Sequence, residues 1–132
     1  MAATVKDGDI HVTFEDQQKI NRFARTNARL VDVKEELTAK EKELENLTYA
    51  DEEIMLLDAD TDTVPYQIGE VLVEMSTEEA QAALEKAKKN CQEEIAALKE
   101  NAESHKQVLS ELKTQLYAKF GSNINLDMDD ES

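Results

Sequence analysis

Apolar residues recur along the first half of the chain with a seven-residue period, and the positions between them are mostly charged. The repeat consists of Phe23, Leu30, Leu37 and Leu44, with Val33, Leu47 and Ile54 at complementary positions. This spacing predicts an α-helix with one apolar stripe, the seam of a coiled coil. The stripe is interrupted or flanked by Asn27, Lys34, Lys40 and Glu41, residues that specify register rather than add stability.

A second and more regular stripe covers residues 84–116, where seam positions are separated alternately by four and three residues. Its members are Leu84, Lys88, Cys91, Ile95, Leu98, Ala102, His105, Leu109, Leu112 and Leu116. The alternation predicts a second coiled-coil helix.

Stop and start signals lie at the ends of both stripes. Thr13 with Asp16 forms a capping-box signature before the first stripe, with Asp in place of the usual Glu, and Ser76 with Glu79 forms one before the second. Gly121 follows the second stripe, where a helix commonly ends on a left-handed residue. The signals predict helices over about residues 14–57 and 77–120.

Two helices of equal length predict an antiparallel hairpin, in which facing residues have numbers that sum to about 135. The predicted pairs are Leu44 with Cys91, Leu37 with Leu98, Leu30 with His105 and Phe23 with Leu112. The fold class is therefore mostly α, a long antiparallel two-helix coiled coil.

The connection between the helices carries a different pattern, with apolar residues at alternate positions on either side of Gly69-Glu70. Alternation predicts two β-strands, and a Gly-X pair between them is compatible with a type II′ turn. Such a hairpin places on one face the residues Val64, Tyr66, Ile68, Val71, Val73 and Met75.

That face is entirely apolar, and a lone two-stranded hairpin is marginal in water and cannot bury it. No other segment offers strands of similar quality. We therefore expect partner subunits to supply the missing strands by pairing at the edges, which makes the protein part of a larger assembly.

The pattern divides the chain into five segments. They are a mobile N-terminal lead (residues 1–12), a first coiled-coil helix (13–57), a linker with the β-hairpin (58–76), a second coiled-coil helix (77–121) and an acidic C-terminal tail (122–132). The tail either keeps the protein soluble or contacts a basic surface on a partner.

The formal net charge of −15 argues against nucleic-acid binding, because neutralising phosphates needs a basic surface. The longest apolar run, residues 54–57, is too short for a membrane span, and the first residues lack the apolar segment of a signal peptide. A lone cysteine, Cys91, fits a reducing compartment. The expected location is the cytoplasm, with a nuclear pool left open.

Candidate chemistry is sparse. Asp58, Asp60 and Asp62 have the spacing that opens a calcium loop, but Thr63 and Gly69 stand where that loop needs Gly and Glu, so an acidic solvated linker is favoured. Cys91 is interpreted as a small seam residue and His105 as a half-buried spacer. No phosphate-binding Gly-rich loop is present. We expect no metal, no cofactor and no enzymatic activity.

Several longer motifs resemble β-class subunits of the prefoldin family. They are residues 12–21 (VTFEDQQKIN), 65–69 (PYQIG), 87–90 (AKKN) and 116–126 (LYAKFGSNINL). The resemblance implies a heterohexamer of α- and β-class prefoldin subunits, whose hairpins form a double β-barrel carrying six coiled coils. It implies capture of non-native actin and tubulin at the coiled-coil tips, and delivery to the cytosolic chaperonin without ATP.

Carried over to this chain, the barrel falls on Tyr66, Ile68, Val71 and Val73. The client-binding tip falls on Phe14, Ile20, Phe23, Leu116, Tyr117, Phe120, Ile124 and Leu126. A simpler interpretation is that Phe14, Phe23, Leu116 and Phe120 close the last layers of the coiled coil. Ile124 and Leu126 follow Gly121, where no helical partner remains, and are better candidates for exposed client contacts; the alternative for these two is that their apolar side chains cap the helix. The alternative function is a coiled-coil scaffold or regulatory adaptor without chaperone activity.

Overall fold

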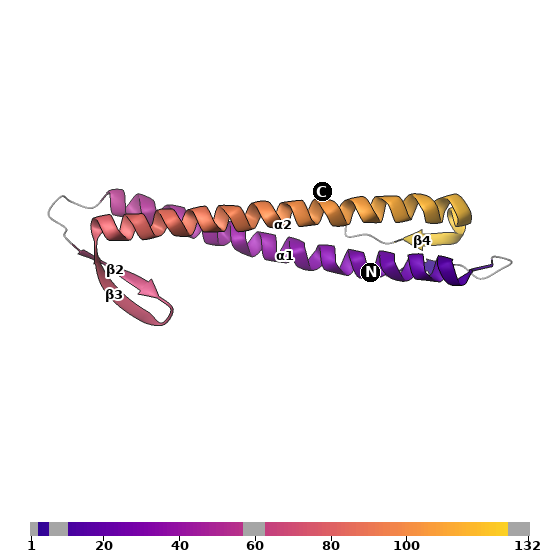
Figure 1. The fold of residues 1–132 in the computed structure, drawn as a ribbon, viewed down its shortest axis with the longest axis horizontal. Helices are drawn as coiled ribbons and strands as arrows, with labels where there is room; N and C mark the ends of the chain where they lie inside the picture. The colour runs from indigo at the N-terminus through magenta and orange to yellow at the C-terminus, as the bar shows by residue number, and fades with distance from the viewer. Residues whose placement is uncertain (1–2, 6–10, 57–62, 127–132) are drawn as a thin grey trace. The chain divides into compact units, whose positions relative to one another are not determined.

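The structure is a computed structural model that describes residues 3–5, 11–56 and 63–126 (Figure 1). The elements in order are β1 (Ala3–Val5), α1 (Phe14–Met55), β2 (Thr63–Ile68), β3 (Val71–Ser76), α2 (Thr77–Phe120), the 3-10 turn η1 (Gly121–Asn123) and β4 (Ile124–Leu126). Two long helices joined by an antiparallel hairpin confirm the predicted fold class. The chain divides into two compact units, unit 1 (residues 1–37 and 98–132) and unit 2 (residues 38–97).

The start of α1 is fixed by the predicted capping box. The Thr13 backbone N–H donates to Asp16 Oδ2 at 3.0 Å, and the Asp16 backbone N–H donates to Thr13 Oγ1 at 3.1 Å. These two bonds satisfy N–H groups that have no partner within a helix. The other end of α1 lies at Met55, close to the predicted boundary.

The ends of α2 also follow the predicted signals. At its start the Glu79 backbone N–H donates to Ser76 Oγ at 3.1 Å, and the Ser76 hydroxyl donates to Glu79 Oε1 at 3.0 Å. At its end Gly121 has a φ of +57°, the left-handed conformation that L side chains disfavour. The chain therefore leaves α2 directly after Phe120 and turns through η1 into β4.

Unit 1 contains the main hydrophobic core, built from one stripe of α1, one stripe of α2 and the residues of β4. Its buried members are Ile20, Phe23, Leu30, Ala102, Leu109, Leu112, Leu116, Phe120, Ile124 and Leu126. Val12, Val33 and Val108 pack against them and are partly buried. The apolar stripes of the sequence thus meet as a packed seam in this unit.

Unit 1 contains a two-stranded sheet that was not predicted. β1 and β4 pair antiparallel, with Ala3 opposite Leu126, Thr4 opposite Asn125 and Val5 opposite Ile124. The segment predicted as a mobile lead (residues 1–12) contains the strand Ala3–Val5, and the predicted tail over 122–132 begins with a turn and a strand. Each strand has only three residues, and the partners lie at opposite ends of the sequence, so neither has a local pattern to reveal it.

Unit 2 contains the second half of α1, the β2–β3 hairpin and the first half of α2. Its buried apolar residues are Val64, Ala80, Leu84, Cys91 and Ile95. Cores of this size bury few large side chains, and the seam residues Leu44 and Leu47 are only half-buried here.

Asp16 joins the cap of α1 to the last turn of α2. Besides its bond with Thr13, its carboxylate forms an ion pair with Lys119. The hydrogen bond from Lys119 and then that from Thr13 lower the pKa of Asp16 from an ordinary 3.8 to about 2. The ionised carboxylate is thus favoured in the folded chain, and its contribution to stability is complete above about pH 4.

We predict that Gly121→Ala lowers the free energy of unfolding by roughly 1 kcal/mol, because Ala must adopt a left-handed conformation. A Cβ built at this position meets no atom within 4 Å, so the cost is conformational rather than steric. Gly121→Asn should recover part of the loss, because Asn tolerates this conformation. Urea unfolding followed by circular dichroism measures both, and an Asn variant as unstable as the Ala variant would contradict this account.

We predict that Asp16→Asn destabilises the folded chain at pH 7 and that the difference from the unaltered protein shrinks as the pH falls from 4 towards 2. Asn keeps an oxygen for the Thr13 N–H but loses the charge that attracts Lys119. Because the folded pKa of Asp16 lies below its unfolded value, acid removes the stabilisation. Unfolding curves across this pH range test it, with the exposed Asp32→Asn as control; a difference that does not change with pH would refute it.

Candidate assembly and capture surfaces

The β2–β3 hairpin has the register that the sequence predicts. The facing pairs include Val64 with Met75, Tyr66 with Val73 and Ile68 with Val71. Gly69 has a φ of +60°, and no non-glycine residue in the described ranges has a positive φ. A positive φ at the first central residue alone is the signature of a type II′ turn, as predicted. The Gln67 side chain also donates to the Gly69 carbonyl at 3.0 Å.

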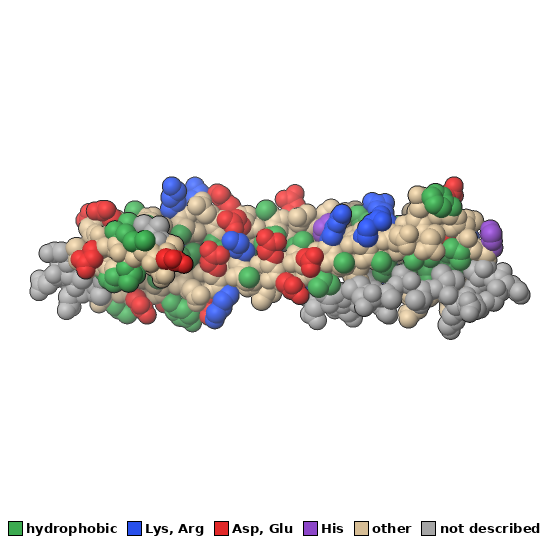
Figure 2. Space-filling model, turned by 90° about the horizontal axis from the view of Figure 1, so that it is seen from below, with side chains coloured by type: hydrophobic (Ala, Val, Ile, Leu, Met, Phe, Trp, Pro, Cys, Tyr) green, Lys and Arg blue, Asp and Glu red, His purple; other side chains and the backbone are tan. Residues whose placement is uncertain are grey.

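Much of the hairpin's apolar surface is uncovered in the chain. Val71 is 61% exposed and Val73 38% exposed, while Tyr66 and Met75 are half-buried. The side chain of Ile68 lies outside the described residues. Leu72, on the opposite face of β3, is 70% exposed. Hydrophobic side chains gather over this hairpin in Figure 2. Sequence reasoning missed Leu72, although an apolar residue on the face expected to be polar was a visible signal.

The helix-proximal part of the hairpin is covered by its own unit. Val64 is buried and lies beside a groove of about 460 Å³ between β2 and the helices. The groove is lined by Leu47, Ala50, Glu53 and Ile54 of α1, Val64, Pro65, Tyr66 and Gln67 of β2, and Leu84 of α2. The expectation that the whole apolar face needs partners therefore does not hold for Val64. The uncovered part lies nearer the turn and on β3.

The predicted seam residues lie between the helices with different degrees of burial. Buried are Leu30, Cys91, Ile95, Leu109 and Leu112, and half-buried are Leu37, Leu44, Leu47, Leu98 and His105. Asn27 is fully buried among them. The ion pair between Asp16 and Lys119 joins residues whose numbers sum to 135, as the predicted antiparallel register requires.

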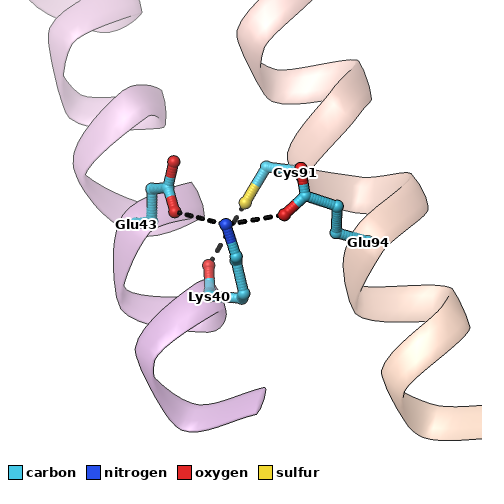
Figure 3. Close-up of polar contacts among 4 residues, drawn as sticks. All are labelled: Lys40, Glu43, Cys91 and Glu94. Atoms are coloured by element: carbon cyan, nitrogen blue, oxygen red, sulfur yellow. Dashed lines mark hydrogen bonds and ion pairs between the residues drawn. The ribbon is translucent and has the colours of Figure 1, made fainter. Parts of the chain in front are cut away.

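Lys40 is the centre of a polar contact inside unit 2 (Figure 3). Its Nζ lies 2.6 Å from Glu94 Oε2 on α2 and 3.3 Å from Glu43 Oε2 on its own helix. Hydrogen bonds to Glu94 and Glu43 raise the pKa of Lys40 to about 12. The residue that interrupts the apolar stripe thus joins the two helices within unit 2.

Cys91 lies beside the same contact. Its thiol donates to the Lys40 carbonyl at 3.3 Å, and the side chain is 3% exposed. Burial raises the pKa of the Cys91 thiol, which disfavours the thiolate needed for nucleophilic or redox chemistry. The position is that of a small core residue.

A further ion pair in unit 2, again between α1 and α2, was not predicted. Lys88 Nζ lies 3.5 Å from Asp51 Oδ2, with the Asp51 side chain 7% exposed. Lys88 occupies a seam position and Asp51 faces it from α1, so the charge is balanced where two helices pack. The signal was present in Lys88, whose charge on a seam position calls for an acidic partner.

The predicted capture residues separate into two groups. Ile20, Phe23, Leu116, Phe120, Ile124 and Leu126 are buried in the core of unit 1. Phe14 is 77% exposed and Tyr117 37% exposed. The expectation that Ile124 and Leu126 are exposed is wrong, because both side chains are buried in the core of unit 1, in agreement with the alternative that they cap the helix end. The turn η1 leads the chain from α2 back into β4 (Figure 1). The interpretation that these residues close the last layers of the coiled coil therefore fits the buried Phe23, Leu116 and Phe120, but it does not fit the exposed Phe14.

Two further expectations concern a calcium-type loop and a membrane-spanning segment. Asp58, Asp60 and Asp62 lie outside the described residues. Within the described ranges neither helix has a stretch long and apolar enough to cross a bilayer.

Comparison with known proteins identifies the family. Residues 17–123 match the sequence model of the family described as "Prefoldin subunit". The chain is 57% identical over 133 residues to prefoldin subunit 4 of Bos taurus, covering 98% of this chain and 99% of that protein. It is 56% identical over 133 residues to prefoldin subunit 4 of Homo sapiens and 44% identical over 139 residues to probable prefoldin subunit 4 of Drosophila melanogaster, again over 98% of this chain, and over 99% and 100% of those proteins.

The fold has a counterpart among solved structures. The crystal structure of the prefoldin beta subunit from Thermococcus strain KS-1 superposes with a TM-score of 0.74 at 20% sequence identity, covering 84% of this chain and 96% of that one. At this identity the match concerns the fold, and the sequence relatives carry the assignment. The chain therefore belongs to the prefoldin family, as a co-chaperone subunit with other prefoldin subunits as its partners.

Proposed function

We propose that the chain is one subunit of an ATP-independent heterohexamer of α- and β-class prefoldin subunits, which captures non-native proteins such as actin and tubulin at the helix ends and delivers them to the cytosolic chaperonin. The proposal places this work in the cytoplasm. The observation that carries it is the uncovered apolar surface of the β2–β3 hairpin, where Val71, Leu72 and Val73 are all exposed.

The hairpin suits assembly for two physical reasons. A two-stranded sheet leaves backbone N–H and C=O groups unpaired along its outer edges, and these can pair with strands of other subunits. Covering an exposed Val or Leu side chain stabilises by about 1.5–3 kcal/mol, so three such residues favour association strongly. Edge pairing gives the geometry, and apolar burial gives most of the free energy.

The capture surface is narrower than the eight residues that the resemblance implies. Because six of them are buried in the core of unit 1, only Phe14 and Tyr117 offer side chains to a client without unpacking the helices. Tyr117 also lies under Lys113, whose Nζ is 5.7 Å from the ring centroid. A cation over an aromatic face holds the ring at the surface, where its edge stays available to an apolar segment.

A scaffold or adaptor function would use the same hairpin for assembly and leave the helix ends without clients. The two functions differ in what the assembled complex binds. A chaperone suppresses the aggregation of diluted, denatured actin, whereas an adaptor binds one folded partner at fixed stoichiometry and leaves aggregation unchanged. Exposed aromatic residues in unit 1 favour the chaperone.

We predict that Val71→Asp combined with Val73→Asp prevents assembly, because two carboxylates would replace apolar surface that partners bury. The dissociation constant should rise at least about 100-fold, which corresponds to losing the burial of two valines. Native mass spectrometry of the reconstituted subunits measures the hexamer. The matched variant with Ile at both positions keeps the apolar surface and should assemble; normal assembly of the Asp variant would contradict the proposal.

We predict that Phe14→Ser combined with Tyr117→Ser weakens client capture while leaving the hexamer intact. The concentration of complex that halves actin aggregation should rise roughly threefold, because two exposed aromatic contacts are lost on one of six subunits. Light scattering measures the effect. Tyr49→Ser is the control, because Tyr49 is an exposed aromatic residue of unit 2, 57% exposed. Equal effects of the control and the test variant would argue against capture at these residues.

A further inference from the structure

The β1–β4 sheet sits where the proposed function places the client. Gly121 and η1 turn the chain out of α2, and β4 then lies against the helix ends in unit 1 (Figure 1). One edge of β4 is occupied by β1, a strand from the other end of the sequence. The structure thus contains one example of an extended segment docked on β4.

β4 offers its backbone rather than its side chains. Ile124 and Leu126 are buried in the core of unit 1, whereas Asn125 between them is exposed. A strand anchored in this way presents its N–H and C=O groups at a fixed place, and pairing with them does not depend on the sequence of the added strand. Recognition of this kind suits non-native chains, which share exposed backbone but no common sequence.

The pairing of β1 is short enough to be exchanged. The register covers three residues, Ala3, Thr4 and Val5, and a two-stranded sheet of that size is marginal in water. The packing of β4 does not depend on β1 alone, because Ile124 and Leu126 contact the helix core. β1 can therefore leave while β4 stays in place.

We propose that β1 is an intramolecular competitor for the client: it covers the edge of β4 until an extended segment of a non-native protein takes its place. This inference rests on the proposed function and adds the mode of binding. It also accounts for a capture site in which six of the eight expected apolar side chains are buried. The client segment pairs through its backbone, and Phe14 and Tyr117 add apolar contact beside it.

The test compares hexamers reconstituted with the unaltered chain, with a chain lacking residues 1–7, and with Thr4→Pro, which removes one backbone N–H from β1. The probe is fluorescent, reduced and carboxymethylated α-lactalbumin, which stays unfolded. If β1 covers the edge of β4 most of the time, the apparent affinity of the hexamer for the probe is its intrinsic affinity multiplied by the small fraction of uncovered sites. Both variants raise that fraction, so they should bind the probe roughly fivefold more tightly than the unaltered hexamer. Thr4→Val, which keeps the N–H and favours strands, should bind no more tightly than the unaltered chain.

Hydrogen exchange on the unaltered hexamer gives a second measurement. Saturation with the probe should speed exchange over residues 3–5 and keep residues 124–126 protected, because one strand replaces another. Weaker or unchanged binding by both variants, or unchanged exchange over residues 3–5, would overturn the inference, as would exchange of β1 between two copies of the chain. If the unaltered hexamer fails to bind the probe at all, the proposed function fails instead.

Discussion

The chain has more apolar surface than two helices and one hairpin can bury, and the rest of the structure follows from this constraint. A pair of helices covers one stripe on each, which unit 1 achieves with Phe23, Leu30 and Leu109 fully packed. Among the described residues, the part of the hairpin nearer the turn has no such partner, and Val71 and Leu72 stay exposed. Additional helices in the chain could cover the exposed apolar residues of the hairpin, and the chain would then not need partner subunits to bury them. In the proposed function, this uncovered part of the hairpin is the surface that other prefoldin subunits cover.

Ion pairs between the helices favour one register, whereas apolar contacts alone would allow the two helices to shift along each other. Acidic residues outnumber basic ones, 30 to 15, and three lysines that face the partner helix each pair with one carboxylate across the seam. Lys119 binds Asp16, Lys40 binds Glu94 and Lys88 binds Asp51. Exposed ion pairs add little stability, but a shift by one turn would leave the partly buried lysines without partners. The polar interruptions of the stripes thus favour one alignment, and the remaining acidic residues keep the outer faces solvated.

The features that could be predicted from the sequence are those set by nearby residues. Thr13 with Asp16, Ser76 with Glu79, and Gly121 each act within one turn, and all three were found where predicted. The hairpin register followed from alternation around Gly69. The β1–β4 sheet could not be found in this way, because its strands are three residues long and more than a hundred residues apart. Contacts between segments far apart in the sequence leave no local pattern, and this is also why Ile124 and Leu126 were wrongly expected to be exposed.

That error changes how capture at the helix ends should be understood. Exposed apolar side chains would bind unfolded chains, but they would also bind each other and promote aggregation of the chaperone itself. Burying Ile124 and Leu126 avoids this, and the proposed mode of binding uses instead the backbone edge of β4, which β1 pairs with in the structure. Phe14 and Tyr117 remain as apolar surface on opposite helices of unit 1. In that proposal, a covered edge with few exposed side chains lets a highly acidic protein hold apolar clients without aggregating itself.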